Sequence, residues 1–209
     1  MHAGLSEEER HRPAVRQLFH DAEGAKPSMT YRKQDFPLAK IRRFLEPGPI
    51  VLVSSAWKGE RNIMTMGWHM VMGFEPSLIG CYIWDENHSF DRIRKSKECV
   101  INIPTADLAA TVVGIGNSFD KFAEFRLTAE SAARVGAPLI CECYANFECR
   151  LVDSSLINKY SLFVLEVGKA HVATSPRFPK TIHYRGDGVF MISGENTCRF
   201  RTKFMPENL

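Results

Sequence analysis

The chain has 209 residues, 44% of them apolar, and its 27 Lys and Arg against 24 Asp and Glu give a formal net charge of +3. This length can bury one full core but does not suit two large domains. The small net charge, with both signs interspersed, does not provide the field that holds nucleic acid or an anionic membrane. No apolar run approaches the roughly 18 residues of a membrane span, so we expect a soluble globular protein with no nucleic-acid or membrane partner.

The N-terminal part of the chain differs from the rest. Residues 1–28 are polar and charged with only a weak apolar pattern, which predicts a flexible arm, or one short helix, preceding one domain over residues 29–209. The first residues do not read as a secretory signal, so we expect a cytoplasmic protein with reduced cysteines. The spacing Cys141-Glu142-Cys143 does not fit a CxxC unit, and no two histidines stand four residues apart, so no metal site is expected.

From residue 49 onward the sequence consists of strand-length segments rich in β-formers. These segments span residues 49–57, 62–74, 77–84, 99–103, 145–152, 160–172 and 188–193. The first three follow one another through short turns and predict an antiparallel meander. The predicted helices are short and cover 89–97, 105–113 and 128–134. Because most strands follow one another without long amphipathic helices, the fold class is mainly β, an antiparallel β-barrel with short helices.

Several common catalytic motifs are absent. The sequence has no GxGxxG after a strand, no GxxxxGK[ST], no HExxH and no GxSxG. What remains is a set of polar residues placed within or next to apolar strands, where each needs a hydrogen-bond partner.

The clearest of these segments is Asn62-Ile-Met-Thr-Met-Gly-Trp68. A strand would place Asn62, Met64, Met66 and Trp68 on one face, with Thr65 and Gly67 on the other. One interpretation is a strand with one solvated face. The other is a slot for a flat aromatic ligand, with Trp68 and the methionines as its apolar wall and Gly67 allowing close backbone approach.

Three further segments carry polar candidates. His88 and Ser89 stand at the start of the predicted helix 89–97, whose first amides could hold a phosphate; in isolation this segment favours the alternative, simple helix capping by Asn87 or Ser89. Asn102 lies within a strand and needs a partner, from the backbone or a ligand. Lys121 stands between aromatic residues, including Phe122, which would let its stem pack while the ammonium meets an anion or remains a solvated charge.

Together these segments resemble the flavin reductase-like FMN-binding family, a group of split β-barrels that includes flavoredoxins. The resemblance covers residues from about 49 to about 190 and rests on the motifs just described in their order, with Glu75-Pro76 and Val100-Ile-Asn-Ile-Pro104 in addition. It implies an antiparallel split β-barrel that binds FMN. Leu165 and Tyr160 depart from the residues that many relatives carry at these places.

Residue by residue, the resemblance implies an FMN site drawn from several segments. The ring and ribityl would be lined by the Asn62 strand, the phosphate held by Ser89 and His88, and positive charge supplied by Lys121. Asn102 and Phe122 would stand behind these, with Tyr160 and Phe190 as further ring contacts. The implied cofactor-binding set is Asn62, Met64, Thr65, Met66, Gly67, Trp68, His88, Ser89, Asn102, Lys121, Phe122, Tyr160 and Phe190.

The resemblance further implies an FMN-dependent NAD(P)H oxidoreductase that passes electrons to a small-molecule or protein acceptor. The chemistry would be the flavin's, so no catalytic side chain is expected. A homodimer with flavin near its interface is also implied. Two alternatives stay open: a flavoredoxin-type electron carrier that does not use nicotinamide directly, and a barrel binding module without flavin.

Overall fold

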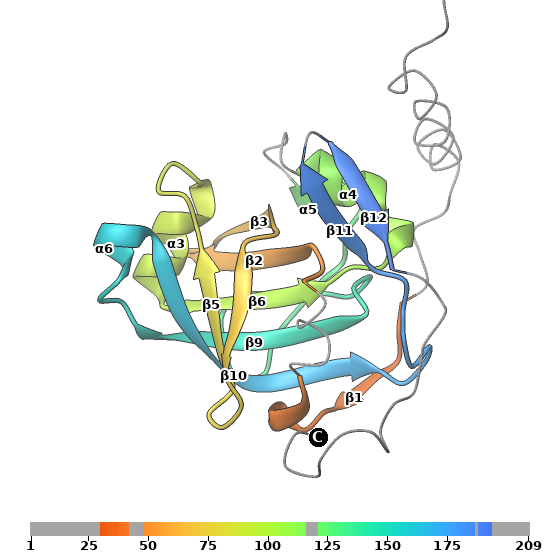
Figure 1. The fold of residues 1–209 in the computed structure, drawn as a ribbon, viewed down its shortest axis with the longest axis horizontal. Helices are drawn as coiled ribbons and strands as arrows, with labels where there is room; N and C mark the ends of the chain where they lie inside the picture. Colours follow the sequence, from red (N-terminus) through yellow and green to blue (C-terminus); the bar gives the residue numbers. More distant parts are fainter. Residues whose placement is uncertain (1–29, 42–47, 116–120, 187, 194–209) are drawn as a thin grey trace, which may run out of the picture.

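The computed structural model describes residues 30–41, 48–115, 121–186 and 188–193 (Figure 1). The predicted N-terminal arm, residues 1–28, lies outside these ranges. Within them, no helix is long and apolar enough to cross a membrane.

One antiparallel sheet forms the body of the molecule. Its strand order is β3-β2-β6-β9-β10-β5-β4, and β1 pairs with β10 off this path. The strands are β1 Lys33–Asp35, β2 Val51–Trp57, β3 Glu60–Met66, β4 His69–Gly73, β5 Leu78–Tyr82, β6 Glu98–Ile103, β9 Ala145–Asp153 and β10 Leu162–Ala173. Since β3 and β4 stand at opposite ends of the order yet are joined by only Gly67 and Trp68, the sheet must curl back on itself. The antiparallel split β-barrel with short helices is therefore confirmed.

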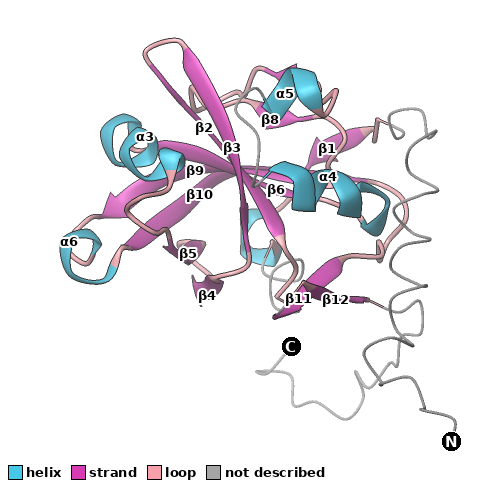
Figure 2. Cartoon of the chain, turned by 90° about the horizontal axis from the view of Figure 1, so that it is seen from above, coloured by secondary structure: helices cyan, strands magenta, loops and turns pink. Residues whose placement is uncertain are grey.

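Two small hairpins and several short helices complete the described residues. The two-stranded pairs are β7 Ala129–Glu130 with β8 Leu139–Ile140, and β11 Ile182–Gly186 with β12 Val189–Ile192. The α-helices are α3 His88–Ser96, α4 Ala109–Gly114, α5 Lys121–Glu124 and α6 Ile157–Tyr160, and the 3-10 turns are Leu38–Lys40 and Ala106–Leu108. Figure 2 shows β4, β5, β11 and β12 along one side of the molecule.

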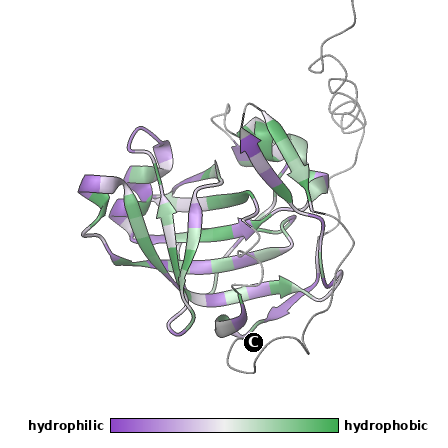
Figure 3. Ribbon diagram, viewed as in Figure 1, coloured by the Kyte–Doolittle hydropathy of each residue, from purple (hydrophilic) through white to green (hydrophobic). Residues whose placement is uncertain are grey.

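The core consists of two main clusters on the two faces of the sheet. Alternate residues of β2 enter different clusters: Val51 and Val53 pack with α3 and the middle strands, while Leu52 packs with α4 and α5. Because both faces of β2 are covered, residues 51–55 are all buried, and its first three residues, Val51-Leu52-Val53, are apolar without alternation. Figure 3 shows the hydrophobic residues running along the strands and through α4.

Most predicted strands are confirmed, but the meander is broken. Residues 62–74 are two strands, β3 and β4, instead of one, and the two do not pair with each other. β3 pairs with β2, and β4 pairs with β5. The chain changes from one end of the sheet to the other at Gly67, where an added Cβ would stand 2.9 Å from Ile50 Cδ1. The small residue therefore fits a close packing contact at the crossing.

The predicted helix over 128–134 is wrong. The segment begins as strand β7 and continues without regular structure. Buried carboxylates take the amides that a helix would have used: Glu142 accepts from the Thr128 amide, and Glu148 accepts from the amides of Ala133 and Arg134. Tertiary hydrogen bonds to charged groups thus override a local helix preference.

A second local correction concerns residue 160. Tyr160 ends helix α6 rather than starting the sixth strand, and β10 begins at Leu162. Ser161 stands between them with φ 53°, in the left-handed conformation that ends many helices. The predicted helices 89–97 and 105–113 are confirmed as α3 and as a 3-10 turn that continues into α4.

Glu148 is expected to stabilise the fold in a pH-dependent way. Burial acts to raise the pKa of this carboxyl, but hydrogen bonds from His171, Ala133 and Arg134 outweigh it and hold the pKa below its usual value. The stabilisation is therefore complete above the ordinary glutamate pKa of about 4.3 and is lost as the pH falls toward the lower folded-state pKa. We expect Glu148→Gln to lower the free energy of unfolding by about 1.5–3 kcal/mol at pH 7, measured by urea denaturation.

The difference between wild type and Glu148→Gln should shrink as the pH drops below about 4.3. Glu75→Gln, at an exposed position, is the matched control and should change the free energy of unfolding little at any pH. A Glu148→Gln effect that does not vary between pH 7 and pH 3 would contradict this account.

Candidate functional site

The candidate site gathers at β3, the strand at one end of the sheet. The ammonium of Lys121, on α5, donates a 2.7 Å hydrogen bond to the carbonyl of Ile63. This carbonyl therefore faces the free edge of β3 instead of β2. Because N–H and C=O of one strand residue point the same way and alternate along the strand, the same edge presents backbone groups of Arg61 and Thr65.

Lys121 is a buried cation. Only 9% of the residue is exposed, and no carboxylate among the described residues forms an ion pair with it. Burial, and then the positive charge of Arg92, lowers the pKa of this lysine from its usual value. The positive charge of a buried ammonium in such a place is poorly neutralised, so a bound anion would stabilise it.

Asn62 connects β3 to the start of α3. Its amide donates a 2.9 Å hydrogen bond to the Ser89 hydroxyl, which is fully buried. The Asn87 side chain in turn accepts from the Ser89 amide at 2.9 Å and so caps the helix. The structure therefore shows helix capping by Asn87, and a phosphate contact at Ser89 stays a prediction.

His88, the other predicted phosphate contact, is exposed. It lines a cleft of ≈ 380 Å³ whose wall includes Glu60, Asp85, Glu86 and Asp91. Arg92 and Lys95 line the same cleft, which is therefore of mixed charge, and His88 as a phosphate contact stays a prediction.

The remaining residues of the β3 motif are mostly buried within the protein. Met64 and Met66 belong to the core on the α3 face, with 4% and 5% of each residue exposed. Thr65 is half-buried, and its hydroxyl donates to the carbonyl of Val112 at 2.6 Å, which ties β3 to α4. The methionines support the strand from behind, whereas Thr65 stands at its free edge.

Asn102 is engaged entirely within the protein. Its amide donates to the Leu52 carbonyl at 3.0 Å, and its oxygen accepts from the Ile140 amide at 3.2 Å and from Asn146 at 2.6 Å. The residue is fully buried. Of the two partners considered for this asparagine, the structure shows the protein, so Asn102 fixes the middle of the sheet.

The four predicted aromatic residues lie in different places. Phe122 and Phe190 pack in the core cluster shared by α4 and α5, whereas Trp68 is 69% exposed beyond the end of β3. Tyr160, on α6, lies well apart from α5 in both ribbon views (Figures 1 and 2). One chain therefore brings Phe122 and Phe190 together near Lys121 but does not bring Tyr160 to them.

Two arginines were missed by the sequence analysis. The Arg61 guanidinium stands 4.6 Å from the centre of the Phe122 ring, and Arg92 forms a 2.7 Å ion pair with Glu60. Arg61 reaches Phe122 because β3 lies beside α5, and Arg92 reaches Glu60 because α3 lies beside β3; local sequence shows neither neighbour. The sequence did offer one signal for Arg92. It follows Ser89 by three residues in the predicted helix, and this spacing places both residues on the same helix face.

The geometry fits a ligand that is both anionic and flat. Lys121 offers a buried cation, the free edge of β3 offers backbone donors and acceptors, and the Phe122–Phe190 cluster offers apolar surface. Opposite Asn62 in the strand register, the buried hydroxyl of Ser55 has no hydrogen-bond partner among the described residues. These groups suit a phosphorylated isoalloxazine, whose rim is polar and whose faces are apolar.

Comparison with known proteins places these features in a family. Residues 42–190 match the model of the flavin reductase like domain. An uncharacterised Archaeoglobus fulgidus protein is 32% identical over 110 residues, 51% of this chain and 62% of that protein, so the chain spans less than two thirds of that relative. The uncharacterised Escherichia coli protein YddH is 31% identical over 173 residues, 73% of this chain and 90% of YddH.

Solved structures agree on the fold. An FMN-binding domain of a flavin reductases-like enzyme from Shewanella baltica is 24% identical, with a TM-score of 0.75 over 83% of this chain and all of that one. Flavoredoxin of Desulfovibrio vulgaris is 20% identical, with a TM-score of 0.66 over 85% of this chain and 98% of that one. The 2-nitrobenzoate 2-nitroreductase NbaA of Pseudomonas fluorescens is 15% identical, with a TM-score of 0.67 over 98% of both chains.

Lys121→Met tests the cationic centre of the site. Methionine keeps the length of the buried stem and removes the charge, so we expect FMN affinity to fall by about 1.5–3 kcal/mol, roughly one to two decades in Kd. Fluorescence titration of FMN measures the affinity, and circular dichroism checks the fold. Lys159→Met, at an exposed site on α6, is the control and should bind FMN as wild type does; equal affinity of Lys121→Met and wild type would remove Lys121 from the site.

Proposed function

The chain belongs to the flavin reductase-like domain family, and on this basis we propose that it is an FMN-dependent NAD(P)H oxidoreductase. The observation that carries the proposal is the buried ammonium of Lys121 at the free edge of β3. No carboxylate among the described residues forms an ion pair with it. A fold without a ligand gains little from such a charge, because burial disfavours it.

When bound, FMN supplies the redox chemistry by taking a hydride from a nicotinamide and passing electrons to a small-molecule or protein acceptor. The chain's own residues bind and orient. Lys121 neutralises the anionic part of the ligand, and Thr65 and its neighbours on β3 present backbone groups to the polar rim. Asn62 holds β3 against α3 through Ser89 at 2.9 Å, which keeps the spacing of the site fixed.

Two alternative functions differ from the oxidoreductase in what the protein binds and reacts with. A flavoredoxin-type electron carrier would hold FMN without using nicotinamide directly, and a barrel module without flavin would leave the Lys121 site for another anion. A reducing cytoplasm fits either flavoprotein, because Cys81, Cys99, Cys141, Cys143 and Cys149 are all free thiols.

Anaerobic mixing of the FMN-loaded protein with NADH or NADPH distinguishes these functions. We expect rapid loss of the flavin absorbance near 450 nm, roughly the position of the oxidised flavin band. Stopped-flow measurement with each nucleotide gives the preference between them. Persistent absorbance with both nucleotides, together with reduction by a low-potential chemical donor, would support the electron-carrier alternative and contradict the oxidoreductase.

We also propose that the protein is a homodimer formed through the side of the molecule that carries β4 and β5. This surface, the β4–β5 face, exposes a row of large apolar side chains. They are Trp68, Met70, Met72, Phe74, Tyr82 and Trp84. Gly80 lets the methionines lie flat, because an added Cβ would stand 2.8 Å from Met72 Sδ and 3.2 Å from Met70 Cγ.

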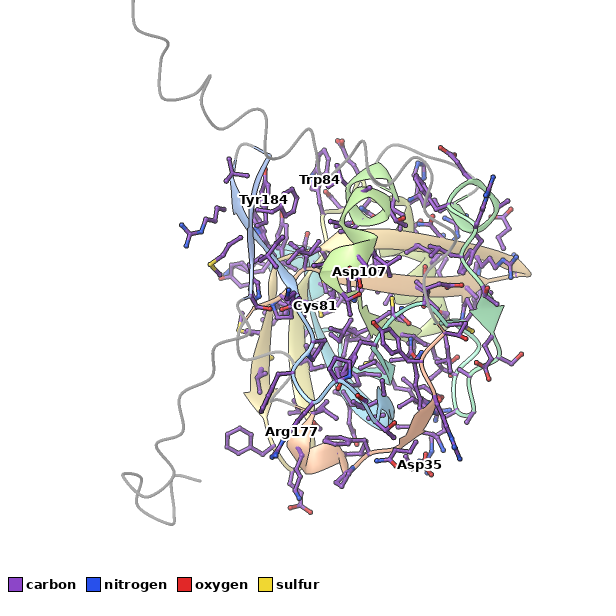
Figure 4. All side chains as sticks on the ribbon, turned by 90° about the vertical axis from the view of Figure 1, so that its right-hand side faces the viewer. Asp35, Cys81, Trp84, Asp107, Arg177 and Tyr184 are labelled. Carbon is purple, nitrogen blue, oxygen red and sulfur yellow. The ribbon has the colours of Figure 1, made fainter. Side chains whose placement is uncertain are left out.

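The β11–β12 hairpin extends the same apolar side. Tyr184, Val189 and Met191 are exposed on it, and Figure 4 shows Tyr184 and Trp84 on the same upper part of the molecule. β4 is also an end strand of the sheet. A large apolar surface beside an end strand is typical of an interface between chains, and a two-fold pair buries the same surface of each copy.

Met70→Asp is expected to convert the dimer into a monomer. A carboxylate at a residue that is 54% exposed leaves the single chain folded but opposes burial against a second copy. Light scattering after size-exclusion chromatography should give twice 23.7 kDa for wild type and 23.7 kDa for the variant. Val152→Asp changes an exposed apolar residue outside this surface and should remain dimeric; a monomeric wild type would contradict the proposed interface.

A further inference from the structure

Three buried thiols lie together in the core cluster on the α3 face of the sheet. Cys81, Cys99 and Cys149 are each 0% exposed and belong to this cluster. All three are free thiols. The candidate flavin site described above uses none of them. A cluster of free sulfur atoms in a dry core is either plain packing, with cysteine as a small apolar residue, or a place where sulfur chemistry can occur.

Two of the three cysteines stand directly opposite each other on neighbouring strands. In the antiparallel pair of β6 and β9, Cys99 is the register partner of Cys149, just as Ile101 is the partner of Phe147. Cα atoms of directly opposite residues in an antiparallel pair are about 4.5–5.5 Å apart, which lies within the range of about 4.4–6.8 Å that a disulfide spans. The backbone of the reduced protein therefore already has the spacing of a cross-strand disulfide.

The sulfur atoms of this pair also interact with each other. Burial raises the pKa of the Cys149 thiol well above its usual value, and a hydrogen bond with the Cys99 thiol raises it further. Burial likewise raises the pKa of Cys81, and electrostatic repulsion from Cys99 adds to it. Cys81 is opposite neither residue, because it lies on β5 and β10 stands between β5 and β9. The register therefore favours a bond between Cys99 and Cys149 over one to Cys81.

From these observations we propose that Cys99 and Cys149 are a redox modification site, which hydrogen peroxide converts into a cross-strand disulfide. The sulfur of one thiol attacks a peroxide oxygen, the O–O bond breaks, and a sulfenic acid and one water form. The second thiol attacks the sulfenic sulfur, so that an S–S bond forms, the S–O bond breaks and a second water leaves. The two thiols together lose two electrons and two protons, and the peroxide takes up both.

The position of the pair within the sheet sets how fast it reacts. Cys99 is the second residue of β6, directly after Glu98, which forms a 3.6 Å ion pair with the exposed Arg150. Local opening at this end of β6 admits a small oxidant without unfolding the barrel. Because burial keeps the Cys149 thiol protonated while the strands are closed, the reaction is slow and requires sustained exposure to the oxidant.

The cross-strand geometry makes the bond reversible. Cβ atoms of opposite strand residues are about 4.5–5.5 Å apart, whereas a relaxed disulfide brings them to about 3.5–4.5 Å. A disulfide between Cys99 and Cys149 therefore stores strain and is reduced more readily than a relaxed structural disulfide. The pair is suited to a reversible response to oxidant rather than to a permanent covalent link between β6 and β9.

Peptide mapping of the purified full-length protein tests the site directly. The protein is exposed to hydrogen peroxide, its remaining thiols are blocked, and the digest is analysed by mass spectrometry without reductant. We expect a time-dependent gain of one linked pair of peptides that contains Cys99 and Cys149. Excess reduced glutathione should return both thiols. The assay needs no nicotinamide and no electron transfer, so its failure and failure of the proposed oxidoreductase are separate results.

Cys143→Ala is the matched control for Cys149→Ala. Cys143 is equally buried but packs in the other core cluster, with α4 and α5, so its variant should still form the disulfide, whereas Cys149→Ala should not. Circular dichroism checks that each variant is folded, and the wild-type map stands without either variant. Wild type that keeps Cys99 and Cys149 reduced, or that links either of them to Cys81 instead, would overturn the proposal. A bond that persists in excess glutathione would overturn its reversibility.

Discussion

The candidate site depends on one hydrogen bond, from the buried ammonium of Lys121 to the carbonyl of Ile63. It holds α5 against β3 and places a positive charge where a strand edge is still unpaired. Burial and the nearby Arg92 both oppose this charge, as the lowered pKa of Lys121 shows. Such an arrangement is unfavourable for the empty fold and favourable once an anion is present, which is a common balance between stability and function.

The barrel was predictable because its strands are long and their composition is distinctive. β2 and β6 contain the consecutive apolar residues Val51-Leu52-Val53 and Cys99-Val100-Ile101, so their strand character is visible in the local composition. The break at Gly67 and the loss of the helix over 128–134 depend on distant partners instead. Ile50 packs against Gly67, and Glu148 takes the amides of residues 133 and 134; neither contact is visible from local spacing.

The candidate site was only partly predictable for the same reason. Lys121 was recognisable as a cation between aromatic residues, and Asn62 as a polar residue within an apolar strand. Sequence could not decide whether Asn102 met a ligand or the protein, because its partners Leu52 and Asn146 are about 50 and 44 residues away. Nor could it reveal Arg61, which reaches Phe122 only because β3 lies beside α5.

The central claim is that Lys121 stands where it does in order to meet the anionic part of a flavin. A crystal structure of the full-length protein grown with FMN tests this most directly. The account predicts FMN density along the free edge of β3, with an anionic oxygen of the flavin within hydrogen-bond distance of Lys121 Nζ. FMN bound elsewhere, or a crystal in saturating FMN with no flavin density at β3, would contradict it.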